Sequence, residues 1–370
     1  MKTYELVLHK INNGLSLSRL EIFEGMKSLI ESSDHEHVRL QMGMILFGLS
    51  VRNPSVDEIL GLCDFVKEVE PMLLQRKLVA QVDGPVIGLS GSGKKGIKTF
   101  NISTPAALIA VTAGAYVAKP VSKATSSTTG SSDLLAIAGA SLNLSHQNML
   151  KALEKTGFGA FSIEHTIPAF DHIYGGRFYS PHALSYVLSA IVNPVKCAVM
   201  MHGLAGEHVD ISAKTLKALG IKKGAVMSST EDGSLYIDEL SPISKNSIAF
   251  WDENSEVSKA QIDIAEAFGC KNFNPEELAP GINNQYQLKI FLDCLRGTGT
   301  PAQLNAVALN SALIIMNSGI EIDPRKAFQL SKDIIASGKA EQTLDHFCEI
   351  TKALAEPSLT SRWNPPEAIP

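Results

Sequence analysis

The sequence lacks closely spaced cysteines of the kind that form zinc sites or redox motifs. Its cysteines are odd in number and lie far apart, at Cys63, Cys197, Cys270, Cys294 and Cys348. No cluster of cysteine with histidine accompanies them. The pattern argues against a structural zinc site and indicates free thiols in a reducing compartment.

Long apolar segments are missing as well. Residues 1–6 include a lysine and a glutamate, and they lack the apolar core and the small-residue cleavage site of a secretory signal. The longest apolar stretch, residues 106–118, is shorter than the roughly 20 residues that cross a bilayer. We therefore expect a cytoplasmic protein without membrane contacts.

There is no excess of positive charge. The 370 residues carry a net charge of −5, which gives no support to non-specific binding of nucleic acid. Hydrophobic residues make up 45% of the chain and charged residues 19%, as is ordinary for a soluble enzyme. Small-molecule partners are therefore expected, and the length suggests two domains.

The pattern of apolar residues divides the chain into three parts. Residues 1–75 show helical spacing, with a capping box formed by Ser18 and Glu21, and indicate a helical domain. Residues 76–355 alternate between helices and short apolar strands, which is typical of an α/β domain. Within this part, helices are expected at residues 260–265 and 303–316. Residues 356–370 contain four prolines and are expected to form a loose tail.

One stretch of the α/β part is suited to holding an anion. Residues 87–90 read as a buried strand, and residues 91–96, Gly-Ser-Gly-Lys-Lys-Gly, follow as a loop with three glycines. A Ser-Thr-Pro start signal at residues 103–105 then predicts a buried helix. Open main-chain N–H groups in the loop and at the helix N-terminus would together suit a phosphate group.

A second strand, loop and helix follow directly. Residues 116–119 read as a strand, and the hydroxyl-rich residues 120–133 form a loop before a helix that begins near Leu134. Lys119 and Lys123 lie between the two units. Two such loops side by side indicate a ligand with more than one phosphate group.

Two further motifs bear on the binding of phosphate and magnesium. Residues 88–95 nearly match the Walker A pattern, but Lys95 stands where a serine or threonine must hold magnesium, so an ATPase is disfavoured. Asp238 and Glu239 are adjacent carboxylates that could bind Mg²⁺ between the protein and substrate phosphates. An acidic pair alone is more often solvated surface.

Three segments together resemble the anthranilate phosphoribosyltransferase family. Residues 91–104 are similar to its signature Gly-Thr-Gly-Gly-Asp…Thr-Phe-Asn-Ile-Ser-Thr, with the last six residues identical. Residues 117–133 are similar to its second loop, Val-Ala-Lys-His-Gly-Asn-Arg…Ser…Gly-Ser-Ala-Asp. Residues 237–241 are similar to its magnesium motif, Leu-Asp-Glu-Ile-Ser. The resemblance covers most of the chain.

This resemblance implies an α/β fold of the nucleoside phosphorylase and phosphoribosyltransferase type. A small N-terminal helical domain would precede a large domain with a central, largely parallel sheet. The protein would be a homodimer that uses Mg²⁺ to transfer phosphoribosyl from phosphoribosyl pyrophosphate to an aromatic or heteroaromatic acceptor, anthranilate or a different one.

The resemblance also implies roles for individual residues. Lys119 and Arg177 are expected to act in catalysis. Ser103, Asp238 and Glu239 are expected to bind metal. The substrates are expected to contact Gly91, Ser92, Gly93, Thr99, Asn101, Ser103, Thr104, Lys119, Ser122, Lys123, Ser131, His165 and Arg177.

The chain departs from the family pattern at two places. Lys94 and Lys95 replace Gly-Asp, which reverses the charge beside the expected pyrophosphate site. Residues 120–123, Pro-Val-Ser-Lys, replace His-Gly-Asn-Arg near the expected acceptor and ribose. The donor half of the site is therefore better retained than the acceptor half.

Two alternatives remain open on the sequence. A nucleoside phosphorylase is possible on a similar architecture, although phosphorolysis has no use for a metal-binding acidic pair. A non-catalytic relative that binds nucleic acid is favoured by Lys94, Lys95 and Lys98 but opposed by the acidic net charge.

Overall fold

The computed structural model describes residues 2–32, 34–124, 129–176, 178–243 and 245–355. Three predictions therefore lie wholly or partly outside the described residues. They concern Arg177, part of the loop at residues 125–128, and the tail at residues 356–370.

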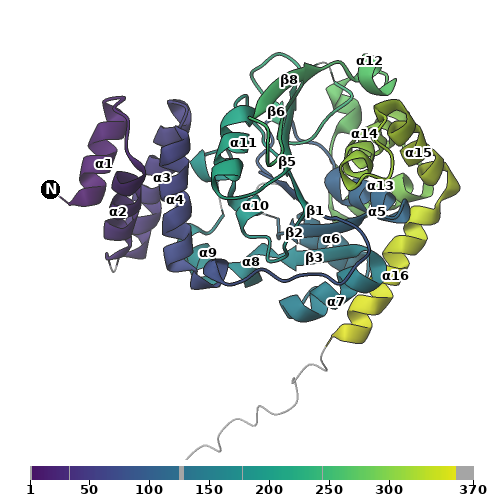
Figure 1. Ribbon diagram of the computed structural model, residues 1–370, viewed down its shortest axis with the longest axis horizontal. Coiled ribbons are helices and arrows are strands. Elements are labelled where there is room, and N and C mark those ends of the chain that lie inside the picture. Colours follow the sequence, from purple (N-terminus) through teal and green to yellow (C-terminus); the bar gives the residue numbers. More distant parts are fainter. Residues whose placement is uncertain (1, 33, 125–128, 177, 244, 356–370) are drawn as a thin grey trace, which may run out of the picture.

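Four helices form a block at the N-terminal end of the molecule (Figure 1). They are α1 (Thr3–Asn12), α2 (Arg19–Ile30), α3 (His35–Val51) and α4 (Val56–Val69). The predicted capping box is present, since Glu21 N donates to Ser18 Oγ at 3.3 Å and Ser18 N donates to Glu21 Oε2 at 2.9 Å. The apolar faces of these helices share one core with Phe170, Leu184 and Trp251. The domain boundary at residue 75 stays a prediction.

The rest of the chain is built around one sheet, and its order is β3-β2-β1-β4-β5-β7-β8, with β6 paired to β5. The strands are β1 (Val86–Gly91), β2 (Tyr116–Val121), β3 (Phe158–Ser162), β4 (Val199–Gly203), β5 (Gly224–Thr230), β6 (Tyr236–Ile237), β7 (Lys245–Trp251) and β8 (Ser258–Ile262). The first five strands in this order are parallel, and β6, β7 and β8 pair antiparallel. The predicted α/β fold with a central, largely parallel sheet is confirmed.

Helices cover both faces of the sheet (Figure 1). One face packs against α5 (Ser103–Thr112), α7 (His146–Thr156), α13 (Asn284–Arg296), α14 (Pro301–Ser318), α15 (Pro324–Ser337) and α16 (Lys339–Leu354). The other face packs against α10 (Leu188–Ile191), α11 (Val209–Ala218) and the N-terminal block. The shorter helices are α6 (Ser131–Ile137), α8 (Ile163–Thr166), α9 (Pro168–Tyr174) and α12 (Ile264–Phe268), with 3-10 turns η1 (Pro71–Leu74), η2 (Ala183–Tyr186) and η3 (Pro275–Leu278).

The helix predicted at residues 260–265 is wrong. Residues 258–262 form the edge strand β8, which pairs with β7 in the register Ser247↔Gln261. The helix α12 begins only at Ile264, where the side chain of Asp263 caps it by accepting from Ala265 N and Glu266 N. Pairing with β7 outweighs the helical preference of this short polar segment. The helix predicted at residues 303–316 is confirmed as α14.

The cysteines are free, as the sequence predicted, and all but Cys197 are buried. The reducing compartment stays a prediction. Across the described part of the chain, no helix has both the length and the apolar character to cross a membrane.

Candidate active site

A cavity of about 250 Å³ opens at the carboxyl ends of β1, β2 and β4, where ligands bind in sheets of this type. Most of the predicted substrate residues line it. They are Gly91, Ser92, Gly93, Thr99, Asn101, Ser103, Lys119, Ser122, Lys123 and Ser131, together with Asp238 and Glu239. The cavity therefore gathers residues that are up to about 150 positions apart in the sequence.

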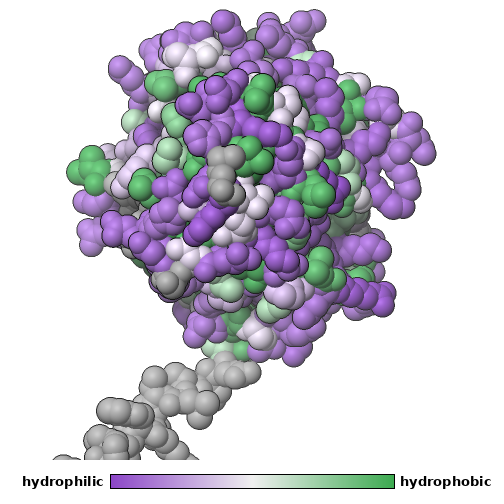
Figure 2. Space-filling model, turned by 90° about the vertical axis from the view of Figure 1, so that its left-hand side faces the viewer, coloured by the Kyte–Doolittle hydropathy of each residue, from purple (hydrophilic) through white to green (hydrophobic). Residues whose placement is uncertain are grey.

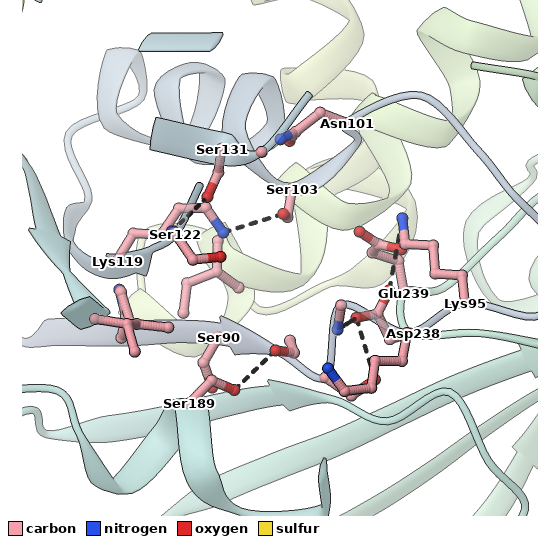
Figure 3. A pocket seen from close by; sticks show the side chains of 18 of the residues that line it. Ser90, Lys95, Asn101, Ser103, Lys119, Ser122, Ser131, Ser189, Asp238 and Glu239 are labelled. Atoms are coloured by element: carbon pink, nitrogen blue, oxygen red, sulfur yellow. Dashed lines mark hydrogen bonds and ion pairs between the residues drawn. The ribbon is translucent and has the colours of Figure 1, made fainter. Parts of the chain in front are cut away.

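Two predicted substrate residues lie elsewhere. Thr104 is fully buried beneath the start of α5, and its main-chain N donates to Asn101 Oδ1 at 3.1 Å. His165 is exposed on α8 and is absent from the cavity wall. Asn101 thus accepts a hydrogen bond from the first turn of the helix that carries Ser103, and Figure 3 shows both side chains near the cavity.

The glycine loop after β1 is held by hydrogen bonds within the protein. Ser92 N donates to Gly203 O at 2.8 Å, and Gly96 N donates to Tyr236 O at 2.9 Å. Gly93, at a φ of 69°, donates its N–H to Asp238 Oδ2 at 2.8 Å. The loop was expected to offer open main-chain N–H groups to a phosphate, but these three are already paired. These three groups are therefore not open to an anion in this arrangement.

The acidic pair lines the cavity directly after β6. Both residues are buried, and their main chain is fixed on two sides. Ser229 Oγ donates to Glu239 O at 2.9 Å, and Asn310 Oδ1 accepts from Leu240 N at 3.2 Å. The last residue of β4, Gly203, allows this approach, because a Cβ there would lie 1.7 Å from Asp238 O.

Lys95 turns inward and pairs with both carboxylates (Figure 3). Its Nζ lies 2.6 Å from Glu239 Oε2 and 3.5 Å from Asp238 Oδ1, and it donates to Thr99 Oγ1 at 2.8 Å. Burial and the neighbouring Asp238 carboxylate raise the pKa of Glu239 to about 8. Burial opposes the charge on Lys95, but the two carboxylates outweigh it and raise the lysine pKa. The pair therefore keeps Lys95 charged.

A second buried lysine lies across the cavity. Lys119, on β2, donates from Nζ to Ser103 Oγ at 3.0 Å (Figure 3). Burial lowers the pKa of Lys119 to about 8. An ammonium group in this surrounding is stabilised when an anion enters, so Lys119 favours a phosphate group beside α5.

The three predicted metal ligands are all engaged by ammonium groups. Ser103 accepts from Lys119, while Asp238 and Glu239 lie against Lys95. In this arrangement the residues do not fit Mg²⁺, which takes near-octahedral oxygen ligands.

The second loop supplies polar groups from β2 and α6. Ser122 N donates to Ser131 Oγ at 3.3 Å, and Lys123 N donates to Glu164 Oε1 at 2.8 Å. Asp133 closes the loop by accepting from Ala124 N at 2.7 Å and Gly130 N at 2.9 Å. The two predicted loops are therefore brought together at one cavity.

One wall of the cavity carries Tyr174 and Lys94, and neither was among the predicted site residues. Lys94 is buried there, and its Nζ donates to Gly176 O at 3.4 Å. Tyr174 lines the same wall, its hydroxyl is 2.7 Å from His182 Nε2, and its ring stacks on Phe178. Burial and the neighbouring Lys98 lower the pKa of Lys94 to about 8. Only the charge reversal at residues 94 and 95 signalled this wall in the sequence.

Comparisons with known proteins agree with the fold. Residues 83–341 match the profile of the glycosyl transferase family, a/b domain. Over 345 residues the chain is 30% identical to the anthranilate phosphoribosyltransferase of Shewanella amazonensis, covering 93% of this chain and 96% of that protein. The enzyme of Aquifex aeolicus is 26% identical over 366 residues, with 96% and 100% covered.

Solved structures show the same fold. The anthranilate phosphoribosyltransferase of Thermus thermophilus superposes with a TM-score of 0.75 at 24% identity, covering 94% of this chain and 99% of that one. The Saccharomyces cerevisiae enzyme in complex with PRPP and Mg superposes with a TM-score of 0.76 at 19% identity, covering 95% and 98%. The chain therefore belongs to the anthranilate phosphoribosyltransferase family, within the glycosyl transferases.

Proposed function

We propose that the protein transfers a phosphoribosyl group from phosphoribosyl pyrophosphate to an aromatic acceptor. The observation that carries the proposal is the cavity itself, in which buried Lys94 from the glycine loop and buried Lys119 from β2 accompany the acidic pair. Relatives that match nearly the whole chain are anthranilate phosphoribosyltransferases, and the yeast enzyme was solved with PRPP and Mg. Both support a donor of this kind.

The reaction breaks the bond between the anomeric carbon and the pyrophosphate oxygen. Positive charge develops on the ribose ring while negative charge grows on the leaving group, so fixed cations lower the barrier. Lys119 is placed to contact the leaving phosphates beside Ser103. The acceptor nitrogen attacks the opposite face of the carbon and then releases its proton to water.

The aromatic wall suits the acceptor. Tyr174 provides an aromatic surface, and Lys94 provides a buried cation beside it. A buried ammonium is stabilised by a negative substituent on the bound ring. We therefore propose an aromatic amine that carries a carboxylate, of which anthranilate is the simplest example.

Pyrophosphate release in the presence of a panel of acceptors tests this function. Anthranilate should support release, while aniline, which has the same amine without the carboxylate, should be poor. Lys94→Met should reduce that preference by about tenfold or more, because a hydrogen bond to a charged group contributes about 1.5–3 kcal/mol. Release with no aromatic amine at all would reject the proposal.

The pKa of Lys94 predicts a pH dependence that is specific to charged acceptors. Because burial holds this pKa near 8, Lys94 is cationic below pH 8 and loses its charge above it. The KM for anthranilate should therefore rise by about tenfold per pH unit above pH 8, while the KM for aniline stays flat. Steady-state kinetics between pH 7 and pH 10 measure this difference, and parallel profiles for the two acceptors would contradict the role of Lys94.

The inward direction of the lysines weighs against nucleic-acid binding. That alternative relied on Lys94, Lys95 and Lys98 together, but Lys94 is buried and Lys95 is paired with the acidic residues. A duplex cannot reach side chains enclosed in this cavity. Contacts to phosphates dominate nucleic-acid binding, and of these three lysines only Lys98 could make them.

We also propose a homodimer that forms through α3. Four apolar side chains at helical spacing, Leu40, Met44, Phe47 and Val51, are 53–68% exposed. They lie in the block of helices that faces the viewer in Figure 2, where apolar groups are set among hydrophilic ones. An exposed apolar stripe of this kind is typical of protein–protein contacts.

Charged substitutions on this stripe should separate the subunits. Met44→Glu combined with Phe47→Glu should convert a dimer into a monomer in sedimentation velocity experiments, because two carboxylates would be buried without partners in the interface. Leu235→Glu, at an apolar position that is 52% exposed outside this block, is the matched control and should leave the mass unchanged. An unchanged dimer in the double variant would reject α3 as the interface.

A further inference from the structure

The acidic pair of this protein already holds a cation. The ammonium of Lys95 lies 2.6 Å from Glu239 and 3.5 Å from Asp238, and these carboxylates are 9% and 4% exposed. The pair carries buried negative charge, which needs a positive partner because an isolated buried charge is strongly disfavoured. Lys95 supplies that partner from the protein itself.

Three of the four carboxylate oxygens of the pair already face a hydrogen-bond donor or the ammonium of Lys95. Asp238 Oδ2 accepts from Gly93 N at 2.8 Å and from Ser92 Oγ at 3.4 Å, so it is held by the glycine loop. Asp238 Oδ1 and Glu239 Oε2 face Lys95. A divalent ion would have to displace the Lys95 ammonium from the carboxylates. It would then lie close to that ammonium, and the two positive charges would repel each other.

The geometry of Lys95 is fixed by its surroundings. Its Nζ donates to Thr99 Oγ1 at 2.8 Å, and its side chain is only 14% exposed. Lys95 comes from the loop after β1, and the acidic pair follows β6, which pairs with β5. The ion pair therefore joins two separate loops that line the cavity, and Figure 3 shows Lys95 beside Asp238 and Glu239.

We propose that the Lys95 ammonium takes the place of a divalent metal ion at Asp238 and Glu239. The pair then positions a lysine, and the lysine presents a permanent positive charge to the cavity without any metal bound to the protein at this position. For donor binding this inference rests on the proposed function. It predicts that phosphoribosyl pyrophosphate binds in the absence of divalent ions.

Binding of Mn²⁺ tests the replacement directly and independently of the donor. Electron paramagnetic resonance should show that the wild-type protein binds no Mn²⁺ at this pair. Lys95→Met keeps most of the length of the side chain but removes its charge, and it should gain one Mn²⁺ site at least about tenfold tighter than any in the wild type. Adding Asp238→Asn should remove that site again, while Lys222→Met, which breaks an exposed ion pair with Glu253, should gain none.

Two results of the Mn²⁺ measurements would overturn the inference. One is a Mn²⁺ site in the wild type that is lost in Asp238→Asn, which needs no lysine variant and so remains decisive if Lys95→Met fails to fold. The other is a folded Lys95→Met protein that gains no site.

Calorimetry with phosphoribosyl pyrophosphate separates this inference from the proposed function. Equal affinity in EDTA and in Mg²⁺ supports both. Binding that requires Mg²⁺ overturns the inference and leaves the function in place. Absence of binding under both conditions overturns the function, while the Mn²⁺ measurements still decide the role of Lys95.

Discussion

Replacing Lys119 with methionine should lower kcat/KM for phosphoribosyl transfer by about a hundredfold to a thousandfold, the usual effect of removing one group that stabilises transition-state charge. Lys119 is a buried cation beside Ser103 at the start of α5, where the leaving phosphates are proposed to lie. Pyrophosphate release under single-turnover conditions measures the change. The loss should appear as a lower kcat and not only as a higher KM, because the charge on the leaving group grows in the transition state.

The same substitution should not destabilise the fold. Burial lowers the pKa of Lys119, which means that the folded protein pays a penalty for its charge. A methionine of similar length removes that penalty, so the melting temperature should be unchanged or higher. Lys155→Met, at an exposed position on α7, is the control for loss of one lysine and should keep full activity. Full activity in Lys119→Met would remove this residue from the mechanism.

Adding a single methyl group at Gly203 should damage both stability and the site. The Cβ of an alanine would lie 1.7 Å from Asp238 O and 2.7 Å from Asp238 C, so β4 and the acidic pair must move apart. Overpacking of this kind costs about 3 kcal/mol of unfolding free energy. Because Ser92 N also donates to Gly203 O, the glycine loop should shift as well, and donor affinity should fall.

A nearby glycine provides the matched control. A Cβ at Gly206 would meet only the side chain of Leu204, at an ordinary contact distance of 3.7 Å. Gly206→Ala should therefore retain stability and donor binding. Urea denaturation and calorimetry compare the two variants. Equal behaviour would show that the close approach of β4 to Asp238 does not support the site.

Much of the fold followed from local patterns. The strand-loop-helix units around β1 and β2 were predictable because buried strands, glycines and a Ser-Thr-Pro helix start leave few alternatives. The edge strand β8 was missed, since its polar residues form a strand only through pairing with β7. A single sequence does not report such long-range pairing.

The sequence predicted most of the residues that form the site, but not the hydrogen bonds and ion pairs between them. The sequence pointed to a cavity with both loops and the acidic pair, and these residues do come together. It could not show that the N–H groups of Ser92, Gly93 and Gly96 are consumed by contacts inside the protein. Nor could it show that Lys95 points inward, since a lysine in a glycine loop is equally compatible with solvent. Both facts depend on where the residues at the ends of β4 and β6 lie in the folded protein.

A crystal structure with phosphoribosyl pyrophosphate bound tests the central claim most directly. The pyrophosphate should lie in the cavity between Lys119 and Lys95, with the anomeric carbon turned toward the wall formed by Tyr174 and Lys94. A donor bound elsewhere, or a cavity that stays empty at saturating donor concentration, would contradict the proposed function.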